Sequence, residues 1–394
     1  MKKRTKMILI GMVLGTVLLN IIAWTSKDFC DFYVENVFPI WLFTYGRLTS
    51  LFSFSVGEVM IVILCVLLVA AAILGIFACA FLICDKTAKK GRTHFQRFLS
   101  IYFNGLLCLG CGVFFIMTLN CFILYHCSTF EEKYMTSYID GTKEYSVEEL
   151  AQVRDFVVMQ VNRYAKMMER DENGLICYEG NMEEEAIRSM QNLAVQYPQL
   201  AGYYPMPKKI RASEFLSQQY MQGYYFPFSM EANYNDVMYV MCKPATICHE
   251  LAHTKGFIYE DEANLLGFLA CIHSDDIVFQ YSGYLSVLTY IDNDFKESIH
   301  QDKTVYNSHV KISSRVKKDR VFLTEDAWTK VEQKAVVKTE TVKKVSSRLI
   351  DANLVLNGIE QGKANYCEVV GLIMDYYAGP EGDFKSEEYM VMGE

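Results

Sequence analysis

Two histidines and one glutamate within five consecutive residues are the side chains of this chain best suited to chemistry. The segment Cys248-His249-Glu250-Leu251-Ala252-His253 places its imidazoles four residues apart, with a carboxylate directly after the first. On a helix, residues four apart share one face, which is the H-E-x-x-H arrangement for binding zinc. His249 and His253 would then hold Zn2+, and Glu250 would act as the general base on the attacking water.

The flanks of this motif predict a short, buried helix over residues 244–255. Pro244 suits a first helical turn, while Lys255 supplies a cation in the last turn and Gly256 a left-handed stop. The other residues of the segment are largely apolar, so the helix should be buried, and buried imidazoles need polar partners. Two core histidines bonded to backbone carbonyls are the alternative that needs no metal.

A catalytic zinc normally has three protein ligands and one open position. The third ligand is expected in the acidic segment Glu260-Asp261-Glu262-Ala263-Asn264, on a second helix that turns back after Gly256. Glu260 and Glu262 point about 200° apart on a helix, so only one of them can face the ion. We predict Glu260 as the ligand, Asn264 on the same face as a group that orients a ligand, and Glu262 as the alternative ligand. The competing interpretation is that these acidic residues bind no metal and only stabilise the positive end of the helix dipole.

Three apolar runs in the first 125 residues, at about 7–25, 56–84 and 99–125, are long enough to cross a bilayer. Lysines and arginines gather before the first run and between the second and third. By the positive-inside rule, a multi-pass protein of the cell membrane is expected, with its N-terminus in the cytoplasm and residues 126–394 outside. A cleaved signal peptide is the alternative for the first run, but no small-x-small site follows it.

Composition narrows the possible partners. With 52% hydrophobic and 21% charged residues among 394, the chain is too apolar to be disordered. The net charge is −8 and the membrane part is basic, so the outer part is acidic and a poor partner for nucleic acid. The thirteen cysteines lack the paired spacing of a disulfide scaffold, although Cys30 and Cys127 could pair outside the membrane. Cys248 points about 100° away from His249 and is expected in the core.

Hydrophobic periodicity predicts the elements that position the motif. Strands are expected at 223–228 and at 236–241, directly before the zinc helix, and an exposed strand edge could bind an extended peptide. Helices are expected at 146–166, 182–196, 260–276, 281–290 and 366–377, with a solvated helical arm over 294–345.

Three further residues are candidates for contact with a substrate. Glu231 precedes the second expected strand and could line a peptide cleft, although a simple turn is the alternative. Tyr281 and Tyr284 follow the second motif helix and could donate hydrogen bonds to an oxyanion. Core packing is the alternative for both tyrosines.

The run from His249 to His253 followed by Glu260-x-x-Ala263-Asn264 resembles the gluzincin pattern. Over nearly its whole length, the chain also resembles a bacterial family of three-helix membrane proteins of uncharacterised function regarded as candidate zinc peptidases. The resemblance is carried by Phe54-Ser55-Val56-Gly57-Glu58, Tyr204-Pro205-x-Pro207-Lys208, Pro227-Phe228-x-x-Glu231-Ala232-Asn233 and Tyr281-Ser282-Gly283-Tyr284-Leu285. It implies an outward-facing metallopeptidase domain. The chain departs from these patterns at two points. The gap between His253 and Glu260 is shorter than in thermolysin-like enzymes, and Ser53 stands where the family pattern has a proline.

The expected fold is mainly α. Three transmembrane helices within residues 1–125 would precede an α+β, zincin-like metallopeptidase domain over 126–394, with a small sheet and two packed active-site helices. The expected function is zinc-dependent hydrolysis of a peptide or protein substrate by a membrane-anchored enzyme. The alternative is a non-catalytic membrane receptor or scaffold with a structural or vestigial zinc site. Intramembrane proteolysis is excluded because the charged motif lies far from the spanning runs.

Overall fold

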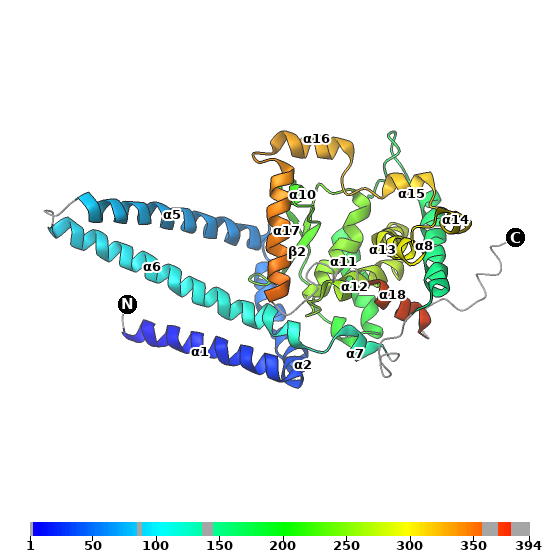
Figure 1. Cartoon of the computed structure of the whole chain (residues 1–394). Helices are drawn as coiled ribbons and strands as arrows, with labels where there is room; N and C mark the ends of the chain where they lie inside the picture. The colour runs from blue at the N-terminus through cyan, green and yellow to red at the C-terminus, as the bar shows by residue number, and fades with distance from the viewer. Residues whose placement is uncertain (1–2, 85–88, 136–144, 357–368, 380–394) are drawn as a thin grey trace.

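Three long helices project from one side of a mainly helical body in the computed structural model (Figure 1). The structure describes residues 3–84, 89–135, 145–356 and 369–379. A three-stranded sheet is the β structure of the body in these ranges. The mainly helical fold with a small sheet agrees with the expectation from the sequence.

The three projecting helices are α1 (Lys3–Thr25), α5 (Val56–Cys84) and α6 (Lys89–Met117). The stretches long and apolar enough to cross a membrane are Lys3–Thr25, Val56–Ala80 and His94–His126. Helix α1 packs along α6, and Asn20 Nδ2 donates to Thr118 Oγ1 at 2.9 Å, just beyond the end of α6. The lengths and apolar composition therefore indicate a membrane protein, as predicted, while the side on which each end lies stays a prediction.

Short helices fill the connection between α1 and α5. They are α2 (Lys27–Asn36), α3 (Phe38–Trp41), the π-helix η1 (Leu42–Gly46) and α4 (Arg47–Thr49). The first three of them, together with η2 (Thr118–Phe122) and η3 (Leu124–His126), contribute to a hydrophobic cluster that we call the second core. Cys30 and Cys127, which could have paired, are both buried free thiols in this cluster. Because Met230 and Ile258 of the body also belong to it, the second core joins the predicted membrane part to the predicted outer part.

The body is built around a larger hydrophobic core that the helices of residues 130–378 surround. Its main helices are α7 (Phe130–Tyr134), α8 (Val147–Met167), α9 (Met182–Asn192), α10 (Ser213–Gln218), α11 (Lys243–His253), α12 (Glu260–Ile272), α13 (Ile277–Ser298) and α18 (Val369–Ala378). Helix α8 begins with a capping box formed by Ser146 and Glu149, which satisfies two backbone groups at this end. The helices predicted at 146–166, 182–196, 260–276 and 281–290 correspond to α8, α9, α12 and α13. Of the helix predicted at 366–377, residues 366–368 lie outside the described residues and the rest is α18.

The sheet has the order β1-β3-β2, with β1 (Lys208–Ile210) parallel and β2 (Gly223–Phe226) antiparallel to the central β3 (Glu231–Asn235). The prediction of a strand over 236–241 is wrong. Asn235 Oδ1 accepts from the N–H of Val237 at 3.1 Å, so the side chain turns the backbone immediately after β3. A 3₁₀ turn, η7 (Val240–Cys242), then leads into α11.

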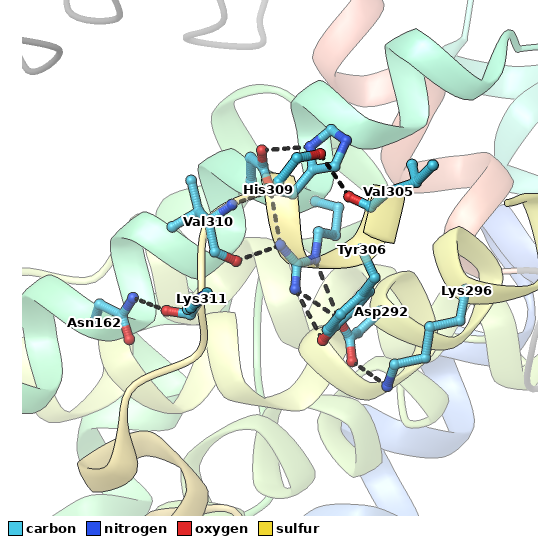
Figure 2. Close-up of polar contacts among 11 residues, drawn as sticks. Asn162, Asp292, Lys296, Val305, Tyr306, His309, Val310 and Lys311 are labelled. Atoms are coloured by element: carbon cyan, nitrogen blue, oxygen red, sulfur yellow. Dashed lines mark hydrogen bonds and ion pairs between the residues drawn. The ribbon is translucent and has the colours of Figure 1, made fainter. Parts of the chain in front are cut away.

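The expected helical arm over 294–345 consists of the end of α13 followed by α14 (Lys303–Ser308), α15 (Ser314–Asp319), α16 (Glu325–Lys334) and α17 (Thr339–Leu356). A buried polar network fastens its first part to the body. Figure 2 shows Asp292, Tyr306 and Val310 arranged around one guanidinium group, which belongs to Arg154 of α8. Arg154 is completely buried and donates to Asp292 Oδ1 from Nε at 3.1 Å and from Nη2 at 2.9 Å.

Removal of one charge from this network should destabilise the fold strongly. Asp292→Ala leaves the buried guanidinium of Arg154 with Asp155 but without its more deeply buried carboxylate partner, so the free energy of unfolding should fall by about 3 kcal/mol, the lower end for a broken buried pair. Lys296→Ala removes a partly exposed member and should cost less than about 1 kcal/mol. Urea unfolding of the detergent-solubilised full chain measures both values. Equal losses of unfolding free energy in the two variants would contradict the importance of the buried Arg154–Asp292 pair.

The same network should make stability depend on acidic pH. Burial by itself raises the pKa of Asp292, but hydrogen bonds from Lys296, Arg154 and Tyr306 outweigh it and hold the pKa below its ordinary value of 3.8. A carboxylate with a lowered folded-state pKa stabilises the fold above its unfolded pKa, and this stabilisation is lost as pH falls through the folded value. The difference in stability between the natural protein and Asp292→Ala should therefore shrink below about pH 4.

Candidate metal centre

Helix α11 carries the motif and is positioned by close packing on α12. It begins with Pro244 in its first turn, and the chain turns at Gly256 with φ of +92°, as the sequence predicts. Gly267 of α12 faces α11: a Cβ atom there would lie 2.8 Å from the carbonyl oxygen of Ala245 and 3.2 Å from the backbone nitrogen of His249. A side chain at position 267 would therefore push the two motif helices apart.

The structure brings the three predicted ligands together. His249 Nε2 lies 3.0 Å from His253 Nε2 and 3.1 Å from Glu260 Oε2, and His253 Nε2 lies 3.8 Å from the same oxygen. Ligand atoms about 2.0–2.1 Å from a tetrahedral zinc are themselves about 3.3 Å apart, so the three atoms have the spacing that a zinc ion requires. We call His249, His253 and Glu260 the metal cluster.

Hydrogen bonds orient the histidine rings. His253 Nδ1 lies 2.7 Å from the carbonyl oxygen of Phe257, which can only accept, so the proton is on Nδ1 and the lone pair of a neutral ring is on Nε2. Asn264 lies close enough to His249 to raise the pKa of that ring, although burial lowers it overall. Nδ1 of His249 and Nδ2 of Asn264 are both buried without a partner.

The charges of the metal cluster are coupled. Burial raises the pKa of Glu260, but its hydrogen bonds with His249 and His253 lower that pKa far below the ordinary value. Burial lowers the pKa of His253, whereas the contact with Glu260 more than offsets this and raises it to about 9. The Glu260 carboxylate attracts positive charge at the two imidazoles. A divalent ion bound in place of a proton would be stabilised by the same carboxylate, so these residues are chemically suited to hold one.

Glu250 follows His249 on α11, is buried, and lies close enough to His253 and Glu260 for their charges to affect its pKa. Burial raises the pKa of Glu250 to about 8; the charge of His253 and the backbone N–H of Tyr225 lower it in part, whereas the charge of Glu260 adds to the increase. Its Oε2 atom is buried and has no hydrogen-bond partner. A Cβ atom on Gly223 would lie 2.7 Å from Oε1, so this strand can approach the carboxylate only because residue 223 is glycine. One oxygen is thus held in place and the other is available to a proton.

Glu262, the alternative ligand, points elsewhere. Its Oε1 accepts from the N–H of Phe130, the first residue of α7, and burial raises the pKa of Glu262 to about 8. The carboxyl group therefore serves the end of a helix whose backbone N–H groups need acceptors. Between the two acids left open by the sequence, the geometry favours Glu260.

The three residues considered for substrate contact do not face the metal cluster. Glu231 is completely buried and accepts from the N–H groups of Val56 at 3.1 Å and Gly57 at 2.8 Å, at the start of α5. It also pairs with the buried Lys208. The carboxylate thus binds the N-terminus of a membrane helix, where negative charge is favourable, and does not line a peptide cleft.

Tyr281 and Tyr284 point into the main core instead of toward the metal cluster. The hydroxyl of Tyr281 donates to Asp319 Oδ2 at 2.8 Å, and the ring is completely buried. Tyr284 packs against the rings of Phe156, Tyr164 and Phe268. Helix α13 packs on α8 and α12, so these two aromatic side chains are buried between helices.

Sequence reasoning missed Gly223, Phe257 and Gly267. Phe257 contributes only its carbonyl oxygen, which the residue type does not reveal. The two glycines are detectable in principle, because a glycine inside an apolar helix or at a strand often marks a close approach of backbone. The sequence does not say which partner approaches.

Loss of Glu260 should weaken zinc binding more than loss of Glu262. Removing a partner of a ligand typically costs 10–100-fold in affinity, so Glu260→Ala, which removes a ligand, should cost at least about 100-fold. Glu262→Ala should leave zinc affinity within about 10-fold of the natural protein. Competition with a chelating dye, together with elemental analysis, measures both. The reverse ranking would assign the ligand to Glu262.

Gly223→Ala should displace the Glu250 carboxylate while leaving the metal cluster in place. The added carbon would meet Glu250 Oε1 and the carbonyl oxygen of Asn233, each at 2.7 Å. We expect zinc content to be retained and the melting temperature to fall. Gly174→Ala is the control. Gly174 has φ of +76° and no atom within 4 Å of an added Cβ, so this variant measures the effect of backbone strain without a steric clash. Equal melting temperatures of Gly223→Ala and the natural protein would refute the close approach.

No curated protein and no solved structure matches the chain. The family model described as "Protein of unknown function (DUF3810)" matches residues 33–374. This range begins after the end of α1 and contains the metal cluster, Glu250 and most of the second core, whose Ala23 and Cys30 lie before it. The chain therefore belongs to the DUF3810 family.

Proposed function

We propose that this protein is a membrane-anchored, zinc-dependent peptidase. The observation that carries the proposal is the position of Glu250, whose buried carboxylate with one unpartnered oxygen lies directly beside three converging ligand atoms. A purely structural zinc site needs the ligands but has no use for this acid. The receptor or scaffold with a structural zinc is therefore the weaker candidate.

The chemistry divides between the ion and the chain. Zinc held by the metal cluster supplies Lewis acidity, which polarises a peptide carbonyl and makes water more acidic. Glu250 accepts a proton from the attacking water and later delivers it to the departing amine. The oxygen of Glu250 that has no hydrogen-bond partner is the atom that can take up and release this proton. The N–H of Tyr225 keeps the carboxylate in place during these transfers.

Strand β2 supports a peptide as the substrate. It is an outer strand of the sheet, and its residues from Gly223 to Phe226 are partly exposed. An extended peptide can add to such an edge through backbone hydrogen bonds, which do not depend on its side chains. Because Glu250 contacts this strand at Gly223 and Tyr225, a peptide paired with β2 would pass the general base.

The distribution of lysine and arginine supports a catalytic body outside the cytoplasm. Basic residues lie at the start of α1 (Lys3, Arg4 and Lys6) and at the start of α6 (Lys89, Lys90, Arg92 and Arg97), which are the ends of these helices away from the body (Figure 1). Positive connections are retained in the cytoplasm, so the body would lie on the opposite side.

Glu250→Gln should abolish hydrolysis and leave zinc bound. Glutamine has almost the same shape as glutamate but cannot accept the proton. The rate of chelator-sensitive peptide cleavage should therefore fall by at least about 100-fold, the lower end expected for general-base catalysis. Zinc content should be unchanged, because Glu250 is not a member of the metal cluster. The measurement is a chelator-sensitive peptide-library assay on the full chain. Full activity in the variant would contradict the mechanism, and a zinc-loaded but inactive natural protein would favour the scaffold.

A further inference from the structure

We propose that the site cleaves polypeptides anchored in the bilayer, close to the point where they leave the membrane. This inference rests on the proposed peptidase function and concerns its substrate class. It follows from the position of the segments that border the metal cluster and Glu250.

The hairpin of β2 and β3 is attached to the body-side ends of two membrane helices. A Cβ atom on Gly57 of α5 would lie 2.7 Å from the ring of Phe226, so helix and strand are in direct contact. On the other side, Asn120 Nδ2 of η2, which follows α6, donates to the carbonyl oxygen of Pro227 at 2.8 Å. The turn between β2 and β3 therefore lies between these helix ends, whereas Gly223, at the far end of β2, contacts Glu250.

The loop between α11 and α12 is attached to the same boundary. Tyr259, directly before the ligand Glu260, donates from its hydroxyl to the carbonyl oxygen of Tyr125 at 2.6 Å, at the end of the third spanning stretch. Ile258 is buried in the second core together with Ala23 of α1. Both segments that flank the metal cluster are thus fixed to the ends of membrane helices.

The connection between α1 and α5 carries apolar side chains that the body leaves uncovered. Leu51 is 78% exposed and Phe32 59% exposed, although both belong to a segment that packs against the body through its other face. The exposed set comprises Phe32, Ile40, Trp41, Phe43, Leu48, Leu51 and Phe52. Arg47 lies over the ring of Phe43 at 4.0 Å, which adds a cation among these aromatic side chains. An apolar and aromatic face next to spanning helices is typical of a segment that lies in the membrane interface.

These placements put the general base a short distance from the bilayer. Strand residues advance about 3.3 Å each, so the length of β2 separates Glu250 from the membrane-facing turn by only about 10–13 Å. A polypeptide that leaves the bilayer and pairs with β2 would reach Glu250 within roughly ten residues. A bilayer-anchored substrate is also held at high effective concentration beside the site.

The test compares one peptide tail in two forms. The full-length protein is reconstituted in phosphatidylcholine vesicles with a single-span peptide whose polar tail has randomised sequence, or with the same tail free in solution. We expect at least a 10-fold higher cleavage rate for the anchored tail, with cuts located by mass spectrometry in its first ten or so residues. Insertion of a 20-residue spacer after the span should move the cuts into the spacer.

The outcomes separate the inference from the proposed function. Equal rates on free and anchored tails, or cuts spread evenly along the tail, would overturn the inference while leaving a peptidase, provided that Glu250→Gln abolishes them. Absence of Glu250-dependent cleavage in both forms would overturn the peptidase and the inference together.

A second measurement does not depend on activity. Trp41 lies in the segment with the exposed apolar face, so in a Trp24→Phe, Trp328→Phe variant its fluorescence reports on that segment alone. Lipids brominated near the glycerol backbone should quench it by at least 2-fold more than lipids brominated at the chain ends. The complementary variant that retains only Trp328 is the control and should not be quenched. Unquenched Trp41 would show that the segment is outside the interface and would overturn the inference.

Discussion

Helix α11 is held between two neighbours that approach it too closely for one additional carbon. On one side, Gly267 lets α12 touch the backbone of α11, which brings Glu260 to the two imidazoles. On the other side, Gly223 lets β2 touch Glu250. The metal cluster and Glu250, the proposed general base, therefore depend on the same kind of constraint, which is a contact that only glycine permits on each side of one short helix. Interiors packed at this density transmit any added volume as a displacement.

The buried charges of this chain bind elements together away from the metal cluster as well. Glu231 accepts the backbone N–H groups at the start of α5, Glu262 accepts that of α7, and Arg154 fastens the segment after α13 to α8. In each case a buried ionisable group meets backbone or an opposite charge, which offsets its cost of desolvation. Burial and a shifted pKa therefore do not by themselves identify a catalytic acid. Glu250 differs from these acids because one of its oxygens has no partner and lies beside the metal cluster.

The second core gives the membrane helices and the body a common hydrophobic interior. Residues from α1, α2 and η3 share it with Met230 and Ile258, which lie next to the sheet and the metal cluster. The body is thus seated on the ends of the spanning helices, as the ribbon also shows (Figure 1). The predicted boundary at residue 125 separates two compositions, but packing across it is continuous because the apolar side chains at these helix ends need covering.

Local information was sufficient for the membrane helices, the motif helix and the two histidines, because each depends on composition or on spacing along one helix. The rotation of a helix showed that only one of Glu260 and Glu262 could face the histidines, but the choice between them needed the tertiary contacts of both acids. The sequence could not determine that 231–235 is a central strand, because its polar side chains are satisfied by distant partners such as Lys208 and the N-terminus of α5. Nor could it determine the directions of Tyr281 and Tyr284, or the partners of Gly223 and Gly267. These features depend on contacts between segments far apart in the chain, which only the tertiary structure decides.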